Sequence, residues 1–154
     1  TKILAVSVGG VDDQNRWIGD IETFGGSSVG YPIIADHDLT ISKAFDMLPA
    51  EAYLPEKPTP ADTQTVRSVF IIGPDKKLKL SMTYPMTIGR NFAEVLRALD
   101  ALQASTRLNL AMPVNWEVGQ DVIVPVAVST DDAKAKYGAV EEIFPYLRRV
   151  KFPA

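Results

Sequence analysis

Two arginines have the residue type and position that best suit chemistry in this chain. Arg67 lies at the start of an apolar, β-branched run that ends at Ile72. An arginine beside a buried strand must pair with an anion or reach solvent. Arg90 lies just before a predicted helix. From the residues alone, each arginine is open to two interpretations: a structural ion pair, or a site for an anionic group of a substrate.

Few other residues offer chemistry. The single histidine, His37, stands between Asp36 and Asp38 before a predicted helix. A solvated histidine near a helix cap is the ordinary interpretation, and a metal site or a hydrolase triad is the minor one. Asp75 lies in a Gly-Pro-Asp-Lys turn, and turn propensity explains it. Because the chain has no cysteine, it contains no disulfide and no thiol nucleophile.

Composition narrows the class of protein. The 154 residues are 46% hydrophobic and 23% charged, with a net charge of −3 and no basic block, so nucleic acid is not expected as a partner. No window approaches the roughly 18 apolar residues of a membrane span. No glycine-rich phosphate loop is present, and neither a cofactor nor a metal ion is expected. We therefore expect a soluble, cytoplasmic protein.

The arginines are positioned by a predicted hairpin and a predicted helix. The hairpin covers Thr65 to Tyr84, with a first strand buried on both faces, a tight turn, and a half-exposed edge strand from Leu78. The helix begins at Asn91, which forms a capping-box-like pair with Glu94. Its expected buried face consists of apolar residues at helical spacing: Phe92, Val95, Leu96, Leu99 and Leu102.

The remaining elements alternate between strand and helix. The first helix is expected to be capped by Asp12 or Asp13 and the second by Asp38. Their expected buried faces are Trp17, Ile18, Ile21 and Phe24 in the first, and Ile41, Ala44, Phe45 and Leu48 in the second. The other expected segments are strands at Lys2–Val8 and Tyr31–Ala35, a loop at Pro49–Pro60, a strand at Asp121–Val128, a helix capped by Thr130, and a strand at Tyr146–Val150.

This order predicts an α/β sandwich with an antiparallel hairpin on one edge, followed by a small tail of strand, helix and strand. The pattern is thioredoxin-like. A change in composition near Leu108 divides the chain into a first domain, residues 1–107, and a C-terminal domain, residues 108–154.

The segment Arg67–Leu80 (RSVFIIGPDKKLKL), with Tyr84-Pro85 and Gly89–Phe92 after it, resembles the one-cysteine peroxiredoxins of the peroxiredoxin-6 type, in the AhpC/TSA-like family. Further similarity lies at Tyr31–Asp36 and Pro113–Trp116. The resemblance implies a thioredoxin-like α/β sandwich and a small C-terminal α+β domain used in dimerisation.

The resemblance also implies an antioxidant thiol peroxidase. Such an enzyme reduces hydrogen peroxide and alkyl or lipid hydroperoxides through a cysteine sulfenic acid, which an external thiol, glutathione or a thioredoxin-like protein, reduces again. Arg67 matches the arginine that stabilises thiolate and peroxide, and Arg90 matches a supporting arginine. Asp75 matches the aspartate of a phospholipase-type site in vertebrate members. A homodimer is implied through the edge strand Lys77–Met86 and the C-terminal domain.

The chain departs from that family in one respect. The family's P-x-x-x-T-x-x-C segment, with the peroxidatic cysteine and its threonine, is expected upstream of Thr1, together with a strand between Lys2–Val8 and Arg67–Gly73. We therefore expect an N-terminally truncated chain that is inactive alone and cannot fold alone into the family structure. The alternative is a non-catalytic dimerisation or binding module in which Arg67 belongs to a structural ion pair.

Overall fold

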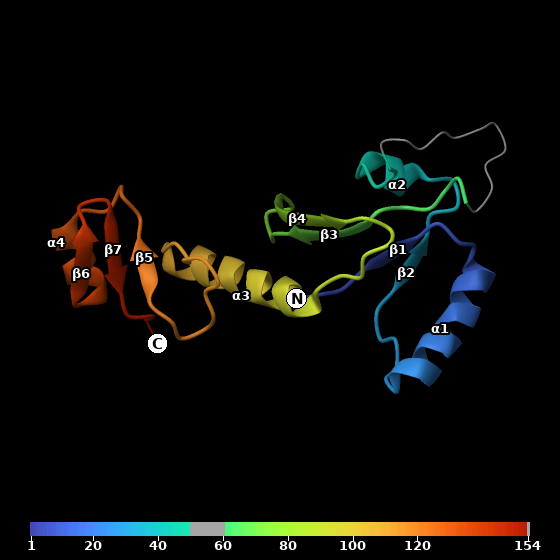
Figure 1. The fold of residues 1–154 in the computed structure, drawn as a ribbon, viewed down its shortest axis with the longest axis horizontal. Helices are drawn as coiled ribbons and strands as arrows, with labels where there is room; N and C mark the ends of the chain where they lie inside the picture. Colours follow the sequence, from blue (N-terminus) through green and yellow to red (C-terminus); the bar gives the residue numbers. More distant parts are fainter. Residues whose placement is uncertain (50–60, 154) are drawn as a thin grey trace. The chain divides into compact units, whose positions relative to one another are not determined.

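The structure is a computed structural model that describes residues 1–49 and 61–153. The predicted loop at Pro49–Pro60 thus falls almost entirely outside the described residues. Contacts divide the chain into two compact units. The first unit comprises Thr1–Val69 with Met82–Arg90, and the second comprises Phe70–Ser81 with Asn91–Ala154. Figure 1 shows the helices and strands of both units.

The first unit begins with a strand, a helix and a parallel strand. β1 (Ala5–Ser7) pairs in parallel with β2 (Ile33–Ala35), and α1 (Val11–Gly25) connects them. The prediction of this βαβ order is confirmed, although both strands are shorter than expected. The predicted cap was wrong, because α1 begins after Gly10, which provides no side-chain hydrogen bond. The helix ends at two glycines, with Gly26 at a φ of 66°.

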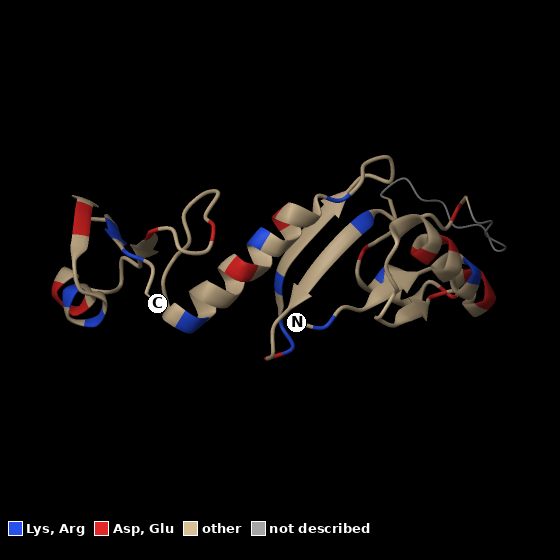
Figure 2. Cartoon of the chain, turned by 90° about the horizontal axis from the view of Figure 1, so that it is seen from below, with Lys and Arg blue, Asp and Glu red and all other residues tan. Residues whose placement is uncertain are grey.

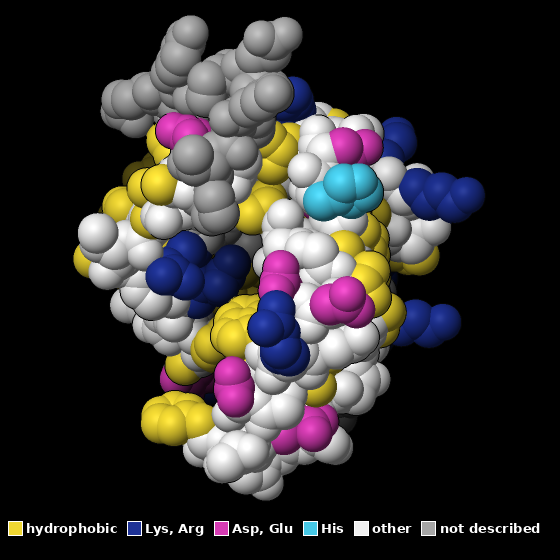
Figure 3. Space-filling view, turned by 90° about the vertical axis from the view of Figure 1, so that its right-hand side faces the viewer, with side chains coloured by type: hydrophobic (Ala, Val, Ile, Leu, Met, Phe, Trp, Pro, Cys, Tyr) yellow, Lys and Arg dark blue, Asp and Glu magenta, His cyan; other side chains and the backbone are white. Residues whose placement is uncertain are grey.

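The predicted buried face of α1 was also wrong. Trp17 is 54% exposed and Phe24 is 97% exposed, whereas the buried residue of this helix is Gln14. The apolar stripe is only partly covered: Ile18 and Ile21 are half-buried, whereas Trp17 and Phe24 are exposed. In the space-filling view, hydrophobic side chains reach the surface among charged ones (Figure 3).

The second helix, α2 (Thr40–Ala44), has Leu39 at its N-cap position without a side-chain capping bond, and its first-turn N–H groups bind mainly to Asp36 rather than to the predicted Asp38. The Asp36 carboxylate accepts hydrogen bonds from the backbone N–H of Ile41 at 2.9 Å and of Ser42 at 2.7 Å. Asp38 accepts from the N–H of Thr40, at 3.1 Å. The helix ends before Pro49, and its expected buried face was wrong: the residues buried in this region are Leu39, Ser42 and Met47, while Ala44 and Phe45 are exposed.

The predicted hairpin is confirmed. β3 (Arg67–Ile72) and β4 (Leu78–Tyr84) form a two-stranded sheet, and the turn is closed by the N–H of Gly73, which donates to the carbonyl of Lys77. β4 alternates between half-buried and exposed residues, as expected of an edge strand. The expectation that β3 is buried on both faces was wrong, because it has a single neighbouring strand among the described residues and Ile72 is 54% exposed.

In the second unit, α3 (Phe92–Leu108) begins where the sequence predicted. The Asn91 side chain accepts a hydrogen bond from the N–H of Glu94 at 3.2 Å. Acidic and basic residues are interspersed along this helix (Figure 2). Its expected apolar face is only partly covered: Phe92 and Leu96 are exposed, and the fully buried positions are Ala98 and Ala104.

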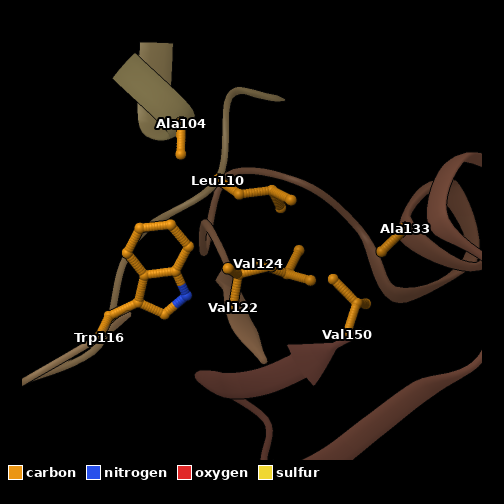
Figure 4. Packing of buried hydrophobic residues seen from close by; sticks show 7 residues of the cluster. All are labelled: Ala104, Leu110, Trp116, Val122, Val124, Ala133 and Val150. Atoms are coloured by element: carbon orange, nitrogen blue, oxygen red, sulfur yellow. The ribbon is translucent and has the colours of Figure 1, made fainter. Parts of the chain in front are cut away.

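The C-terminal part of the second unit contains the main hydrophobic core (Figure 4). Trp116 is fully buried, its ring nitrogen donates to the carbonyl of Gln120 at 3.0 Å, and its ring lies 5.5 Å from that of Phe152. Fully burying one large apolar side chain is worth roughly 1.5–3 kcal/mol. The members of this core come from α3, the segment that follows it, two strands and the short last helix: Ala104, Leu110, Trp116, Val122, Val124, Ala133 and Val150.

The last sheet has the strand order β5-β7-β6, all antiparallel. Its elements are β5 (Val122–Val124), α4 (Thr130–Tyr137), β6 (Val140–Phe144) and β7 (Leu147–Val150). β6 was not predicted, because its residues after Val140 are exposed and carry no apolar alternation. β5 lies at an edge of this sheet, and the cap of α4 is Ser129, one residue before the predicted Thr130.

The mixed helix and strand content agrees with the predicted α/β class. Within the described ranges, no ladder joins the β1–β2 sheet to the β3–β4 sheet, and the expected missing strand stays a prediction. No helix in the described part of the chain is long and apolar enough to cross a membrane. The domain division at residue 107 stays a prediction.

Candidate functional site

The two arginines lie in the same unit and are held by backbone carbonyls. Arg67, at the start of β3, donates from Nε to the carbonyl of Met86 at 2.7 Å. Arg90 donates from a terminal nitrogen to the carbonyl of Ser68 at 3.4 Å. These bonds run between the first residues of β3 and the segment that follows β4. The hairpin therefore brings two guanidinium groups together that are distant in the sequence.

The electrostatics show that the two charges are near one another. The pKa of the Arg90 guanidinium is lowered, first by its burial and then by the positive charge of Arg67. Neither arginine forms an ion pair with a carboxylate of residues 1–49 or 61–153. Two neighbouring cations without a carboxylate partner favour binding of an anion between or beside them.

A hydroxyl pair joins the two strands of the hairpin. The hydroxyl oxygens of Ser68 on β3 and Thr83 on β4 lie 3.1 Å apart. Because either hydroxyl can donate, one donor of this pair remains available to a further oxygen. Sequence reasoning missed Ser68, Thr83 and the Met86 carbonyl. The signal that could have found them is the hairpin itself, since its turn brings the start of β3 opposite the end of β4.

Asp75 lies in the hairpin turn, as predicted, and its contacts are with lysines. Its carboxylate accepts hydrogen bonds from the ammonium of Lys79 at 2.7 Å and from the N–H of Lys77 at 3.2 Å. The Lys79 bond is the main reason that the pKa of Asp75 lies below its usual value, and the Lys77 bond adds to it. These bonds explain Asp75 as a turn residue, and its role in a phospholipase-type site stays a prediction.

The cluster around His37 is explained by capping. His37 is exposed. Asp36 is buried and uses its carboxylate on Ile41 and Ser42. Burial by itself raises the pKa of Asp36, but the hydrogen bonds from Ser42 and Ile41 together outweigh it and the pKa is lowered. Among the described residues, no three histidine, cysteine or acidic side chains come together as metal ligands.

The chain matches two known sequence families. Residues 1–81 match the AhpC/TSA family, and residues 101–139 match the C-terminal domain of 1-Cys peroxiredoxin. The mitochondrial peroxiredoxin PRX1 of Saccharomyces cerevisiae is 44% identical over 151 residues, which are 97% of this chain and 57% of that protein. The 1-Cys peroxiredoxin B of Oryza sativa is 43% identical over 139 residues, 90% of this chain and 61% of that protein. The chain thus spans about six tenths of the length of these relatives.

Solved structures agree with the sequence families. A yeast mitochondrial 1-Cys peroxiredoxin, studied for its thiol resolving mechanism via glutathione/thioredoxin systems, superposes with a TM-score of 0.87 at 44% identity over 97% of this chain and 70% of that one. A cysteine-to-serine mutant of peroxiredoxin 6 from Arenicola marina gives 0.87 at 38% identity, over 99% and 70%. These structures confirm the thioredoxin-like α/β fold. This chain belongs to the 1-Cys peroxiredoxins of the AhpC/TSA family.

Proposed function

We propose that this chain supplies the cationic part of a thiol peroxidase site. The enzyme reduces hydrogen peroxide and alkyl or lipid hydroperoxides through a cysteine sulfenic acid. The observation that carries the proposal is the pair formed by Arg67 and Arg90, two neighbouring guanidiniums with no carboxylate partner among the described residues. Membership of the peroxiredoxins supplies the reaction class.

The chemistry requires a thiolate from outside these 154 residues, since they contain no cysteine. The thiolate attacks one peroxide oxygen, an S–O bond forms and the O–O bond breaks. The leaving alkoxide or hydroxide takes up a proton and departs as alcohol or water. Guanidiniums near the reacting oxygens stabilise both the thiolate and the charge that develops on the leaving oxygen. Arg67 takes this role, and Arg90 supports it by holding the carbonyl of Ser68 and adding a second charge.

The sulfenic acid is then reduced by external thiol. One thiol forms a mixed disulfide and releases water, and a second thiol releases the enzyme cysteine. Glutathione or a thioredoxin-like protein is the proposed reductant. The glutathione and thioredoxin systems are named for the yeast structure that this chain resembles. The proposed compartment is the cytoplasm, although the yeast relative is a mitochondrial protein.

A second function is assembly without catalysis. β4 has one neighbouring strand among the described residues, so the other side of Lys77–Met86 is open to pairing with a second copy. We propose a homodimer through this edge and through residues 108–154. In the purely structural alternative, Arg67 forms an ion pair. The described residues contain no such pair for Arg67, and this favours the catalytic proposal.

The test is a chimera in which the cysteine-containing N-terminal segment of a 1-Cys peroxiredoxin relative precedes Thr1. The chimera should consume hydrogen peroxide with a thiol reductant, and the 154-residue chain alone should not, because it lacks the nucleophile. Arg67→Ala in the chimera should slow sulfenic acid formation by about a hundredfold or more, the size of effect expected when one stabilising group is removed from a reacting oxygen.

Arg107→Ala provides the matched control, because it removes an exposed arginine in the last turn of α3. Its rate should equal that of the unmodified chimera, and light scattering should give the same mass for all variants. Equal rates for the Arg67 and Arg107 variants would support the assembly function instead. Catalytic peroxide consumption by the chain alone would contradict the proposal.

A further inference from the structure

The segment that follows β4 begins with a β-turn that holds Arg67. The N–H of Ile88 donates to the carbonyl of Pro85 at 3.0 Å, and this bond closes the turn Pro85–Ile88. The carbonyl of Met86, inside the turn, accepts from Nε of Arg67 at 2.7 Å. All of these residues belong to the first unit. The acceptor that orients the guanidinium is therefore a backbone atom of a turn and not a side chain.

Pro85 restricts the backbone of this turn. Its ring fixes φ, it has no N–H with which to continue β4, and it keeps Tyr84, the last residue of β4, extended. Neither Met86 nor Thr87 has a positive φ, so the turn requires no glycine. Glycine in place of Pro85 would give the turn many other backbone conformations. The direction of the Met86 carbonyl thus depends on a backbone that Pro85 restricts, and the Met86 side chain is not needed for it.

The bond through Nε decides which donors of Arg67 stay available. A guanidinium carries its N–H donors in a rigid planar fork. Because Nε is directed at Met86, the terminal nitrogens are the donors left for an oxygen of a ligand. A second bond ties the same two segments together, since Arg90 donates to the carbonyl of Ser68 at 3.4 Å. A fork that is already fixed loses little freedom when a reacting oxygen binds to it.

We propose that Pro85 is a positioning residue for Arg67, an inference that rests on the proposed peroxidase function. The turn holds the carbonyl of Met86, and the carbonyl holds Nε of Arg67. The terminal nitrogens then keep one orientation in which they stabilise the thiolate and the leaving oxygen. A displacement of about 1 Å in a group of this kind can cost up to about a hundredfold in rate.

The first experiment follows the Nε–H of Arg67 by NMR, in the ¹⁵N-arginine-labelled chain and in the chimera. Its exchange with water should be about tenfold slower than that of the exposed Arg107, for which the described residues show no acceptor. Pro85→Gly should remove most of this protection. Met86→Ala removes the side chain but keeps the carbonyl, so the protection should remain.

Pro125→Gly provides the matched control. Pro125 begins a turn of the same kind in the second unit, where the N–H of Val128 donates to its carbonyl at 3.0 Å. Replacing either proline by glycine stabilises the unfolded chain to a similar extent. The control should therefore lower the melting temperature as Pro85→Gly does, while the exchange of the Arg67 Nε–H stays slow.

The second experiment measures sulfenic acid formation in the chimera. Pro85→Gly should slow this step about tenfold, and Pro125→Gly should leave it unchanged. Combining Pro85→Gly with Arg67→Ala should give the rate of Arg67→Ala alone, because a residue that acts through Arg67 has no effect once the guanidinium is gone. A general structural loss would instead slow both backgrounds by the same factor.

The two experiments distinguish this proposal from the proposed function. An unchanged rate in the Arg67→Ala chimera would contradict the proposed function, and the exchange of the Nε–H would still show whether Pro85 orients Arg67. Three results would overturn the role of Pro85 while leaving that of Arg67 intact. They are an unprotected Arg67 Nε–H in both the chain and the chimera, equal protection in the two glycine variants, and equal slowing by Pro85→Gly with and without the guanidinium.

Discussion

The guanidinium of Arg90 is half-buried close to that of Arg67, and burial together with the charge of Arg67 lowers its pKa. Each arginine is tied to a backbone carbonyl, Arg67 to Met86 and Arg90 to Ser68. Like charges held near one another repel, and the repulsion is relieved when an anion binds or a charge is removed. The repulsion between the two arginines therefore favours binding of an anionic ligand at this site.

The first prediction concerns that repulsion. Because a lowered folded-state pKa means that the folded protein disfavours the charged form, removing the charge of Arg67 should raise stability at any pH where both arginines are charged. Arg67→Gln and Arg67→Lys both lose the Nε bond to Met86, but only the lysine variant retains the charge. In low salt, Arg67→Gln should melt about 1–2 °C above Arg67→Lys.

Thermal denaturation in increasing sodium chloride provides the check on this prediction. The difference between the two variants should disappear at about 0.5 M salt, because the screening length is then shorter than the separation of neighbouring surface charges. A difference that persists in high salt would show that packing, not charge, separates the variants.

The second prediction concerns Asp36, which caps α2. Its folded-state pKa is lowered by hydrogen bonds from Ser42 and Ile41 that outweigh the effect of burial. A carboxyl whose pKa is lower in the folded protein stabilises the folded state at pH values above its unfolded-state pKa. This stabilisation is lost as the pH falls through the folded-state pKa. Asp36→Asn should therefore cost about 2 kcal/mol of unfolding free energy at pH 7 and progressively less below about pH 4.

Urea denaturation at several pH values measures the effect, with Asp38→Asn as the control. Asp38 is exposed and accepts a single backbone hydrogen bond from Thr40, so its substitution should have a much smaller effect at pH 7. Equal losses in the two variants would contradict the assignment of Asp36 as the main cap.

The elements that were predicted correctly are those whose hydrogen bonds join residues near one another in the sequence. The Asn91 cap, the Gly73–Lys77 turn and the alternation along β4 depend on neighbouring residues, and all three are confirmed. Burial depends on distant elements and was predicted poorly. Trp17 and Phe24 have the periodicity of a buried face, yet both are exposed. A pattern shows which face is apolar, but not what packs against it.

The candidate site shows the same limit. Arg67 stood out because a charge next to an apolar strand needs an explanation, and Arg90 because it precedes a capped helix. Neither signal shows that the two lie near one another or that Ser68 contacts Thr83, since both relations depend on how the strands pair. The order of the last sheet, in which β7 lies between β5 and β6, was missed because β6 carries mostly exposed residues.

The third prediction concerns the core of the second unit. Trp116 is fully buried and bonded to the carbonyl of Gln120, so Trp116→Ala should cost about 3–5 kcal/mol of unfolding free energy. Phe24→Ala removes a comparably large ring that is 97% exposed and should change stability by less than about 0.5 kcal/mol. Chemical denaturation followed by circular dichroism compares the two, and a larger loss from the Phe24 variant would show that α1 is covered in solution.

The last prediction concerns Arg148 on β7, which is 3% exposed. Its terminal nitrogens donate to the hydroxyl of Thr130 and to the carbonyl of Pro125, each at 3.1 Å, and its Nε has no partner among the described residues. Glu142 lies opposite in the β6–β7 register and contacts Thr130 rather than Arg148. A buried cation with one unmatched donor and no direct carboxylate contributes little net stability.

Arg148→Met should therefore change the unfolding free energy by less than about 1 kcal/mol, because the apolar side chain fills the same space without requiring desolvation of a charge. Thr130→Val should cost more, about 1–3 kcal/mol, because it leaves a second nitrogen of the buried guanidinium without an acceptor. Combining the two substitutions should remove most of the Thr130 loss, since the guanidinium that needed the hydroxyl is gone. Urea denaturation of the two single variants and the double variant measures this coupling. Additive losses in the double variant would show that Thr130 stabilises the end of α4 independently of Arg148.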